Sequence, residues 1–420
     1  MTDLLAYLDG TSAGTFSMNA SGRLAFAYDD DYRSSGVPTP MSLSMRPTRA
    51  AWTSRAAAPF LAGLLPDSPD RLAELASRYR TSQNPFRLLE KVGRDAAGAV
   101  QLLPPDEAAG DAASRTGDVE RLSADDVAEL LASASRDPGV WGRQDHGGRW
   151  SLAGARSKVA LFRFPDGSWG VPRDSTPTTH VLKPAVAALP DHDVNEFVSM
   201  AAARALGLDV ADHELVRTVS GTHVYVTRRF DRVERDGVWH RLHQEDFCQA
   251  MSVDPSRKYQ DQGGPSVRQI ARVVAENVTD HDARSATQRA LFDSLVFTVA
   301  SQNTDAHAKN YSLVLSGSDV RLAPLYDLGS HAPYPMRGGA PLQSAMSIGD
   351  EYALDAIGEG QFRDVARSLS IPADEAVDRY RRIVGGVAEA YETAAAQVDE
   401  PFATTLSESI AANASRRGWS

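Results

Sequence analysis

Residues 303–310 read Asn-Thr-Asp-Ala-His-Ala-Lys-Asn and follow a predicted helix at residues 284–301. In this stretch a carboxylate, Asp305, precedes an amide, Asn310. Phosphoryl transfer needs a carboxylate that accepts the proton of the attacking hydroxyl and an amide oxygen that helps to hold Mg²⁺. The Asp-x-x-x-x-Asn spacing is that of the protein-kinase catalytic loop. A polar loop with Asx turns shows the same spacing, so the pattern alone does not establish catalysis.

A second acidic segment, residues 324–329, reads Pro-Leu-Tyr-Asp-Leu-Gly and follows a predicted strand pair within residues 311–322. In kinases an aspartate that begins an Asp-Phe-Gly triplet binds Mg²⁺ downstream of the catalytic loop. Here Asp327 begins Asp-Leu-Gly. The complete order, with the Asp-x-x-x-x-Asn loop first, then the strand pair and then Asp-Leu-Gly, is much rarer by chance than either motif alone. It predicts Asp305, Asn310 and Asp327 as catalytic residues, with Asn310 and Asp327 as Mg²⁺ ligands.

An upstream lysine, Lys183, ends an apolar stretch that is predicted to be a strand. Such a lysine can reach the phosphates of ATP, and a carboxylate on the next helix, here Glu196, can orient it. Residues 151–158 read Ser-Leu-Ala-Gly-Ala-Arg-Ser-Lys, and their small residues suit a phosphate-binding nest of backbone N–H groups. Alternatively, Lys183 is a surface lysine on a strand, Glu196 is a solvated helix residue, and residues 151–158 form an ordinary turn at the start of a strand.

The order of predicted elements indicates an α+β protein in four parts. Residues 1–103 form a small α+β subdomain, residues 104–149 a linker with a helix, residues 150–243 a β lobe, and residues 244–420 a mainly helical lobe. A β lobe followed by a helical lobe predicts a cleft between them, into which the candidate residues would converge.

Local signals place the elements of these parts. Asp9-Gly10 predicts a tight hairpin turn, and Pro59 is expected in the first turn of its helix. Further strands are expected at residues 23–28, 158–164, 180–182, 214–217, 223–229 and 239–242. Helices are expected at residues 58–65, 70–79, 84–92, 124–134, 193–206, 245–251, 267–277 and 371–394.

Composition excludes several classes of protein. Of the 420 residues 42% are apolar, which is ordinary for a globular chain, and the net charge of −11 argues against a stand-alone nucleic-acid binder. A single cysteine, Cys248, permits no intramolecular disulfide, so a reducing cytoplasm is expected and Cys248 is expected to be a small buried residue. We expect neither a signal peptide nor a membrane span.

Beyond these single motifs, the chain resembles the HipA family of bacterial serine/threonine kinases, the toxin half of HipA–HipB type toxin–antitoxin pairs. The resemblance runs almost end to end. The motifs that carry it, in family order, are Leu64-Leu65-Pro66-Asp67, residues 93–101, Ser151–Ala155, Leu182-Lys183-Pro184, Asn195-Glu196, Arg229-Phe230-Asp231-Arg232, Lys258-Tyr259 with Gly263-Gly264-Pro265, Asn303–Asn310 and Leu325-Tyr326-Asp327.

The resemblance implies a bilobal protein-kinase-like fold with an additional N-terminal subdomain, and ATP and Mg²⁺ as cofactors. It implies Asp305 as the catalytic base and Glu196 as the residue that orients the ATP lysine. The implied ATP-binding residues are Lys183, Ser151, Ala153, Gly154, Ala155, Lys158, Arg229, Phe230, His307 and Lys309. Ser151 aligns with a serine that family members autophosphorylate, and Ser157 is a second candidate. A phosphate there would oppose the phosphates of ATP and silence the kinase.

The resemblance also implies partners. One is a HipB-like helix-turn-helix antitoxin, through which the chain would meet DNA only indirectly. Another is a protein substrate among translation components, such as an aminoacyl-tRNA synthetase, whose phosphorylation arrests growth.

The chain departs from the family pattern at Arg156, Ser157, Arg228 and Gln302. They bear on nucleotide contacts and leave the proposed catalytic residues intact. Two other functions stay open at this point. One is a small-molecule kinase, since aminoglycoside phosphotransferases use the same Asp-x-x-x-x-Asn loop. The other is a catalytically weak kinase-like protein that only binds a HipB-like partner.

Overall fold

The computed structural model of the protein describes residues 2–107, 112–136, 151–154, 156–185, 189–219, 221–334 and 341–419. Helices account for 39% and strands for 24% of the residues so described, which confirms the predicted α+β class. The chain forms two compact units, each assembled from separate stretches of sequence. The first comprises Met1–Ala187, Val216–Ser256 and Leu313–Val320, and the second comprises Ala188–Leu215, Arg257–Ser312 and Arg321–Ser420. The four-part division of the sequence stays a prediction.

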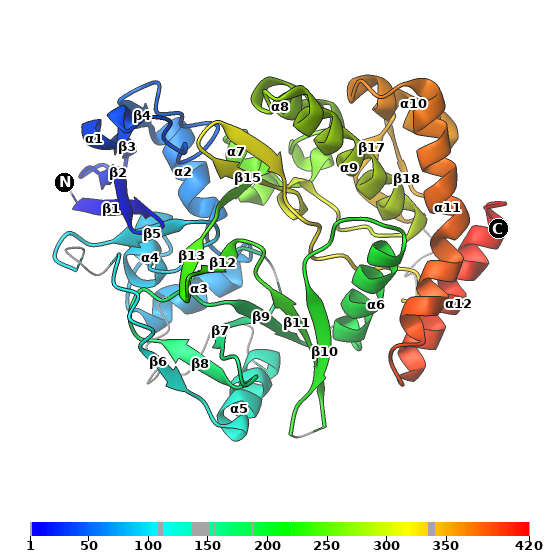
Figure 1. The fold of residues 1–420 in the computed structure, drawn as a ribbon, viewed down its shortest axis with the longest axis horizontal. Coiled ribbons are helices and arrows are strands. Elements are labelled where there is room, and N and C mark those ends of the chain that lie inside the picture. Colours follow the sequence, from blue (N-terminus) through cyan, green and yellow to red (C-terminus); the bar gives the residue numbers. More distant parts are fainter. Residues whose placement is uncertain are drawn as a thin grey trace. The chain divides into compact units, whose positions relative to one another are not determined.

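The first unit begins with a five-stranded sheet in the order β4-β3-β2-β1-β5 (Figure 1). Its strands are β1 (Thr2–Leu8), β2 (Thr11–Met18), β3 (Leu24–Tyr28), β4 (Ala51–Thr53) and β5 (Val100–Leu103). The predicted hairpin is confirmed, because Leu8 pairs with Thr11. Asp9 and Gly10 have φ angles of 49° and 81°, the left-handed backbone that a two-residue hairpin turn requires.

Short helices pack on this sheet around a core that includes Phe16, Phe26 and Phe60. They are α1 (Asp30–Ser34), α2 (Ser54–Gly63), α3 (Pro69–Arg78) and α4 (Pro85–Val92). One prediction was wrong in detail: α2 begins at Ser54, so Pro59 lies inside the helix and not in its first turn. The three alanines at 56–58 are strong helix formers and extend the helix toward its N-terminus despite the missing N–H of Pro59.

A six-stranded sheet in the order β10-β11-β9-β7-β8-β6 carries the predicted β lobe. Its strands are β6 (Val119–Arg121), β7 (Val159–Arg163), β8 (Trp169–Pro172), β9 (His180–Pro184), β10 (His213–Arg217) and β11 (His223–Arg228). Helix α5 (Ala124–Arg136) contacts β7 and β9 over a core that includes Leu131, Val159 and Leu182. The segment predicted as a linker therefore contains an edge strand, β6, which pairs with β8.

After this sheet come a hairpin, a short strand and one turn of helix. These are β12 (Arg232–Arg235), β13 (Val238–Arg241), β14 (His243–Asp246) and α7 (Phe247–Ala250). The helix predicted from residue 245 starts later, because Asp246 ends the strand and caps the helix in a capping box with Gln249. Cys248 is buried in α7, as expected.

The second unit is mainly helical. Its helices are α6 (His192–Ala205), α8 (Val267–Asn277), α9 (His281–Ala300), α10 (Glu359–Ser368), α11 (Ala373–Ala395) and α12 (Pro401–Arg416), and its short strands are β17 (Gln343–Ile348) and β18 (Glu351–Ala353). Helix α11 packs along α6, α9 and α12 (Figure 1). The C-terminal half of α9 is completely buried, which fixes the start of the loop that follows it.

The predicted strand pair after that loop is confirmed as β15 (Ser312–Ser316) and β16 (Asp319–Leu322). Within the described ranges, no helix has the length and apolar content that crossing a membrane requires.

Candidate active site

The loop at 303–310 is held by its own amide side chains. Asn303 Oδ1 accepts a hydrogen bond from the backbone N–H of Asp305 at 2.9 Å, and Asn310 Nδ2 donates to the backbone carbonyl of Asp305 at 2.7 Å. The backbone N–H of Asn303 donates to Thr298 O at 2.9 Å, which ties the loop to the end of α9. The structure therefore brings the two residues of the Asp-x-x-x-x-Asn pattern into direct contact, by the Asx-type bonds such loops favour.

The side chain of Asp305 lies at the surface beside two rings. It is 44% exposed, whereas His307 is 4% exposed, and His307 Nε2 is 3.8 Å from Asp305 Oδ1. The hydroxyl of Tyr259 donates a hydrogen bond to the same Oδ1. The rings of Tyr259 and His307 meet edge to face, with centroids 5.0 Å apart. The carboxylate is thus both accessible to a substrate and fixed on one side.

The segment that carries Asp327 is tied both to this loop and to the stretch that follows α6. Leu325 forms an isolated parallel β-bridge with Val210. The hydroxyl of Tyr326 donates to Lys309 O at 2.9 Å and lies 2.6 Å from Ser312 Oγ. Asp327 itself has a φ angle of 57°, a left-handed backbone that few residues other than glycine adopt. Such a conformation persists only where the surroundings impose it, and it is common at functional sites.

Helix α6 fixes the residues that follow Asp327. Asn195, completely buried, donates through Nδ2 to Ser330 O and accepts through Oδ1 from Ser330 N, both at 2.8 Å. Gly329 packs closely on α6, because a Cβ atom at this position would lie 3.0 Å from the ring of His192, which would have to shift. The Asp-Leu-Gly segment is therefore clamped between the loop at 303–310 and α6.

The oxygen donors in this region suit magnesium. The amide nitrogen of Asn310 is engaged by Asp305 O, so its Oδ1 is the end of the amide that is able to bind a cation. With the carboxylate of Asp327 it would supply hard oxygen donors of the kind Mg²⁺ prefers. Among the residues that the structure describes, no group of three or more His, Cys, Asp or Glu side chains forms a metal site. Phosphate and water would have to complete the coordination.

Lys183 and Glu196 lie in different units. Lys183 is on β9 opposite Tyr225 of β11, with its Nζ 5.6 Å from the centre of that ring. Glu196 lies in α6 and is 1% exposed, so it is not the solvated helix residue of the alternative interpretation. The predicted pairing of the two side chains stays a prediction.

The loop at 151–158 packs against the N-terminal part of the first unit. Ser151 Oγ donates to Leu64 O at 2.6 Å, and Ser151 N donates to Asp95 O at 3.0 Å. Gly154 forms a parallel bridge to Pro66. Ala155 lies outside the described residues.

The second half of the loop is fixed by two cationic side chains. Lys158 Nζ donates to Ala153 O at 2.5 Å, beside Gly154, whose φ angle of 105° favours glycine. Arg71 Nη2 donates to Ser157 Oγ at 3.1 Å. Ser157 is 2% exposed and Ser151 is 1% exposed. Both candidate phosphorylation sites are therefore covered in this conformation.

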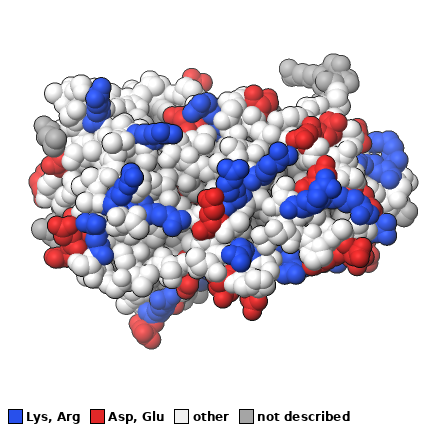
Figure 2. All heavy atoms as spheres, turned by 90° about the horizontal axis from the view of Figure 1, so that it is seen from above, with Lys and Arg blue, Asp and Glu red and all other residues white. Residues whose placement is uncertain are grey.

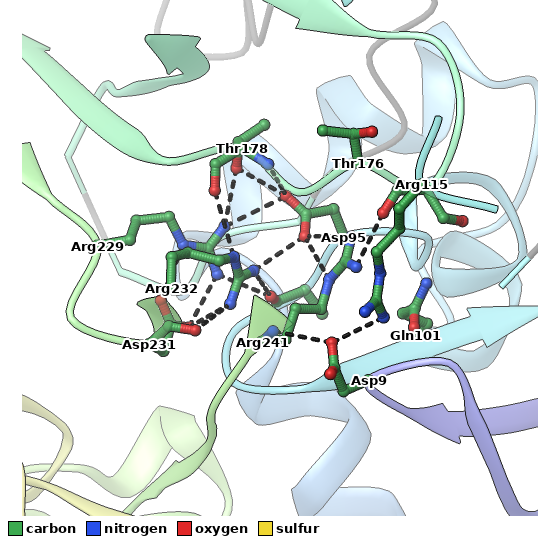
Figure 3. A network of polar contacts seen from close by, with 12 residues as sticks. Asp9, Asp95, Gln101, Arg115, Thr176, Thr178, Arg229, Asp231, Arg232 and Arg241 are labelled. Atoms are coloured by element: carbon green, nitrogen blue, oxygen red, sulfur yellow. Dashed lines mark hydrogen bonds and ion pairs between the residues drawn. The ribbon is translucent and has the colours of Figure 1, made fainter. Parts of the chain in front are cut away.

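Arg229 is a buried residue of the first unit. Its guanidinium is buried in a network of charges, shown in Figure 3, and donates to Asp231, Asp95, Thr178 and the carbonyl of Ala96. Burial would lower the pKa of Arg229, but the carboxylates of Asp231 and Asp95 raise it. Its donors are engaged inside the protein, and a contact of Arg229 with ATP stays a prediction.

The other predicted ATP-binding residues differ in how deeply they are buried. Phe230 is half-buried, and Lys309 and His307 are almost fully buried within the loop at 303–310. Their roles toward phosphate or adenine stay predictions.

Three residues that shape the site received no role from sequence reasoning. Tyr259 and Asn195 were visible as parts of family motifs, but nothing in those motifs connects them with Asp305 or Ser330. Arg71 had no signal at all, because its partner lies 86 positions away.

Two family models match the chain: the HipA N-terminal domain over residues 4–103 and the HipA-like C-terminal domain over residues 150–394. "Putative kinase Y4mE" of Sinorhizobium fredii is 33% identical over 423 residues, covering 98% of this chain and 97% of that protein. "Serine/threonine-protein kinase toxin HipA" of Shewanella oneidensis is 26% identical over 396 residues, covering 91% and 87%.

A solved structure of the HipA, HipB and operator DNA complex from Shewanella oneidensis has a TM-score of 0.81 and 24% identity, over 98% of this chain and 97% of that one. This likeness confirms the predicted kinase-like fold class. With both family models matched in order and a relative similar over almost its whole length, the chain belongs to the HipA family.

Proposed function

We propose that the chain is an ATP- and Mg²⁺-dependent serine/threonine protein kinase. The observation that carries the proposal is the geometry of the loop at 303–310. There, Asp305 presents an accessible carboxylate, as a general base requires, and Asn303 and Asn310 hold the backbone N–H and carbonyl of Asp305. The names of the relatives, two of them kinases, support the same activity.

In the proposed reaction a serine or threonine hydroxyl attacks the γ-phosphorus of ATP. A new oxygen–phosphorus bond forms, the bond from the γ-phosphorus to the leaving ADP oxygen breaks, and the hydroxyl proton passes to the carboxylate of Asp305. Lys183 would bind phosphate oxygens. Asn310 and Asp327 would hold Mg²⁺, which when bound offsets the negative charge of the phosphates.

We further propose that the chain inactivates itself by phosphorylating Ser151 or Ser157. Both hydroxyls are buried and hydrogen-bonded, so either one must leave its position before it can accept phosphate. Once it carries a dianion, Ser151 would no longer fit against Leu64 O, because a carbonyl and a phosphate repel each other. Phosphorylation is therefore expected to keep the loop out of its observed place.

The proposed protein substrate is a translation component, such as an aminoacyl-tRNA synthetase, and the proposed partner is a HipB-like helix-turn-helix antitoxin in the cytoplasm. The related Shewanella structure contains HipB and operator DNA, which supports such a partner. The chain has a net charge of −11, and on the face drawn in Figure 2 basic side chains are interspersed with acidic ones. We therefore expect contact with DNA to depend mainly on the antitoxin.

The test is incorporation of ³²P from [γ-³²P]ATP into the purified chain. We expect Asp305→Ala and Asp327→Ala each to abolish it, and Asp319→Ala to leave it unchanged. Asp319 is a matched control. It is an exposed aspartate at the start of β16, between Asp305 and Asp327 in the sequence. Mutants of Asp305 and Asp327 that autophosphorylate like the wild type would show that the site is assigned wrongly.

Comparing the phosphoproteomes of cells that express the wild type or Asp305→Ala would identify the substrate. Phosphosites on a translation protein that depend on Asp305 support the proposal. Phosphate found only on small molecules would favour a small-molecule kinase. Growth arrest by both forms alike would favour a protein that acts by binding.

A further inference from the structure

We propose that Tyr259 is a positioning residue for the catalytic base Asp305, an inference that rests on the proposed kinase function. Its hydroxyl donates a hydrogen bond to Asp305 Oδ1, 46 positions along the chain. The longer contact from His307 Nε2, at 3.8 Å, reaches the same oxygen. With Oδ1 held by both neighbours, Oδ2 is the oxygen that receives the substrate proton.

The backbone around Tyr259 is a tight turn that leaves this residue little freedom. Its carbonyl accepts hydrogen bonds from Gln262 N at 3.1 Å and Gly264 N at 2.9 Å. A Cβ atom on Gly264 would lie 2.6 Å from that carbonyl oxygen, a distance that real side chains do not show. Gly263 has a φ angle of 89°, which also favours glycine. Both glycines are thus needed for the turn that holds Tyr259.

The next residue anchors this turn to the β17–β18 sheet. Gln260 Nε2 donates to Ser347 Oγ at 2.9 Å, and Gln260 Oε1 accepts from Ser347 N at 3.0 Å. Two bonds from one amide group fix both the position and the rotation of its side chain. Gln260 takes no part in the reaction itself, but it fixes where the ring of Tyr259 can lie.

The ring of Tyr259 completes the arrangement. It meets the ring of His307 edge to face, and Lys258 Nζ lies 5.6 Å from its centre. His307 is almost fully buried, so it is a firm support, whereas Asp305 is 44% exposed. A carboxylate at the surface would otherwise rotate about its side-chain bonds. The hydroxyl of Tyr259 removes this freedom, and misplacing a reacting group by about 1 Å can cost roughly 100-fold in rate.

A merely structural role for Tyr259 predicts a different outcome from a positioning role. Loss of structure lowers the fraction of active protein. Loss of positioning lowers the rate constant of the chemical step while ATP binding stays the same, because the base does not contact the nucleotide before reaction. Gln260 should act only through Tyr259, so its effect should vanish once the hydroxyl is gone.

The experiment measures the first-order rate constant of ³²P incorporation into the full chain at saturating ATP and Mg²⁺, together with the KM for ATP. We expect Tyr259→Phe to lower the rate constant about tenfold or more and to change KM less than about twofold. Tyr32→Phe is the matched control. It also removes a hydroxyl hydrogen bond, to Thr39 O at 2.7 Å, but in the first unit. This control should behave like the wild type.

Gln260→Ala should also slow the reaction, and Tyr259→Phe combined with Gln260→Ala should be no slower than Tyr259→Phe alone. The inference is overturned if Tyr259→Phe reacts at the wild-type rate while Asp305→Ala is inactive. Phosphate found by mass spectrometry on Tyr259 itself would also overturn it, since the hydroxyl would then be an acceptor. A wild type that incorporates no phosphate, or an Asp305→Ala chain as active as the wild type, would instead refute the proposed function.

Discussion

Replacing Asp95 with alanine removes the centre of the buried charge network in the first unit. Asp95 Oδ1 lies 2.9 Å from Arg232 Nη2 and 3.0 Å from Arg241 Nε, and Oδ2 lies 3.4 Å from Arg229 Nη1. Oδ2 also accepts hydrogen bonds from Thr178 N at 3.0 Å and Thr178 Oγ1 at 2.7 Å. Figure 3 shows the three guanidinium groups converging on this one carboxylate.

The expected cost is large because the carboxylate and its cationic partners are buried. The side chains of Arg232 and Arg241 are fully buried, and that of Asp95 is 9% exposed. Removing one partner of a buried ion pair costs about 3–5 kcal/mol. An unsatisfied Thr178 N–H adds roughly 1–3 kcal/mol. We therefore expect the free energy of unfolding of the first unit to fall by about 5 kcal/mol, against a typical total of roughly 5–15 kcal/mol.

The assay is urea unfolding at pH 7, followed by circular dichroism. With a slope of roughly 3 kcal/mol/M, Asp95→Ala should lower the midpoint by about 1.7 M. Asp166→Ala is the control, because Asp166 forms a 2.7 Å ion pair with Arg121 that is more than half exposed. Solvent screens such a pair, so its loss should hardly move the midpoint. If both variants shift the midpoint equally, the network does not stabilise the fold as argued.

The network also predicts that the protein loses stability at low pH. Burial alone would raise the pKa of Asp95, but Arg232, Arg241 and Arg229 hold it far below its usual range. A carboxyl group with a depressed pKa in the folded state contributes stability above its unfolded pKa, which is about 4, and loses that contribution as the pH falls below it. The wild type should therefore lose stability between pH 4 and pH 2 more steeply than Asp95→Ala.

Three further perturbations test other parts of the structure. Asn195→Ala leaves the buried backbone of Ser330 without its two partners, so it should destabilise the second unit by about 2 kcal/mol in urea and slow ³²P incorporation. Lys183→Met should lower kcat/KM for ATP by about 100-fold without changing the urea midpoint, and an unchanged kcat/KM would exclude it from the nucleotide site. Burial raises the pKa of Glu245 to about 8, so stability should fall by about 1.4 kcal/mol per pH unit from pH 5 toward pH 8, because the unfolded chain ionises more easily. Glu245→Gln should flatten this decline, and an unchanged slope would show that Glu245 is not its source.

Sequence reasoning succeeded where the signal is local. The Asp9-Gly10 hairpin was predictable because only a few residue pairs adopt its left-handed turn. The helix at Val267–Asn277 was predicted with its observed bounds, since Ser266 and Gln269 form a capping box at its start. The start of α2 was missed, because the proline signal conflicted with the helix-forming alanines before it.

In the candidate site, too, local features were predictable from the sequence and contacts between distant residues were not. By itself the sequence determined the loop that carries Asp305 and Asn310 and its order relative to Asp327, because spacing and turn chemistry are properties of neighbouring residues. Only the tertiary structure decided that Tyr259 lies on Asp305, that Asn195 clamps Ser330 across 135 positions, and that Arg229 is buried in a charge network. These contacts depend on how distant elements pack, which residue spacing along the chain does not specify.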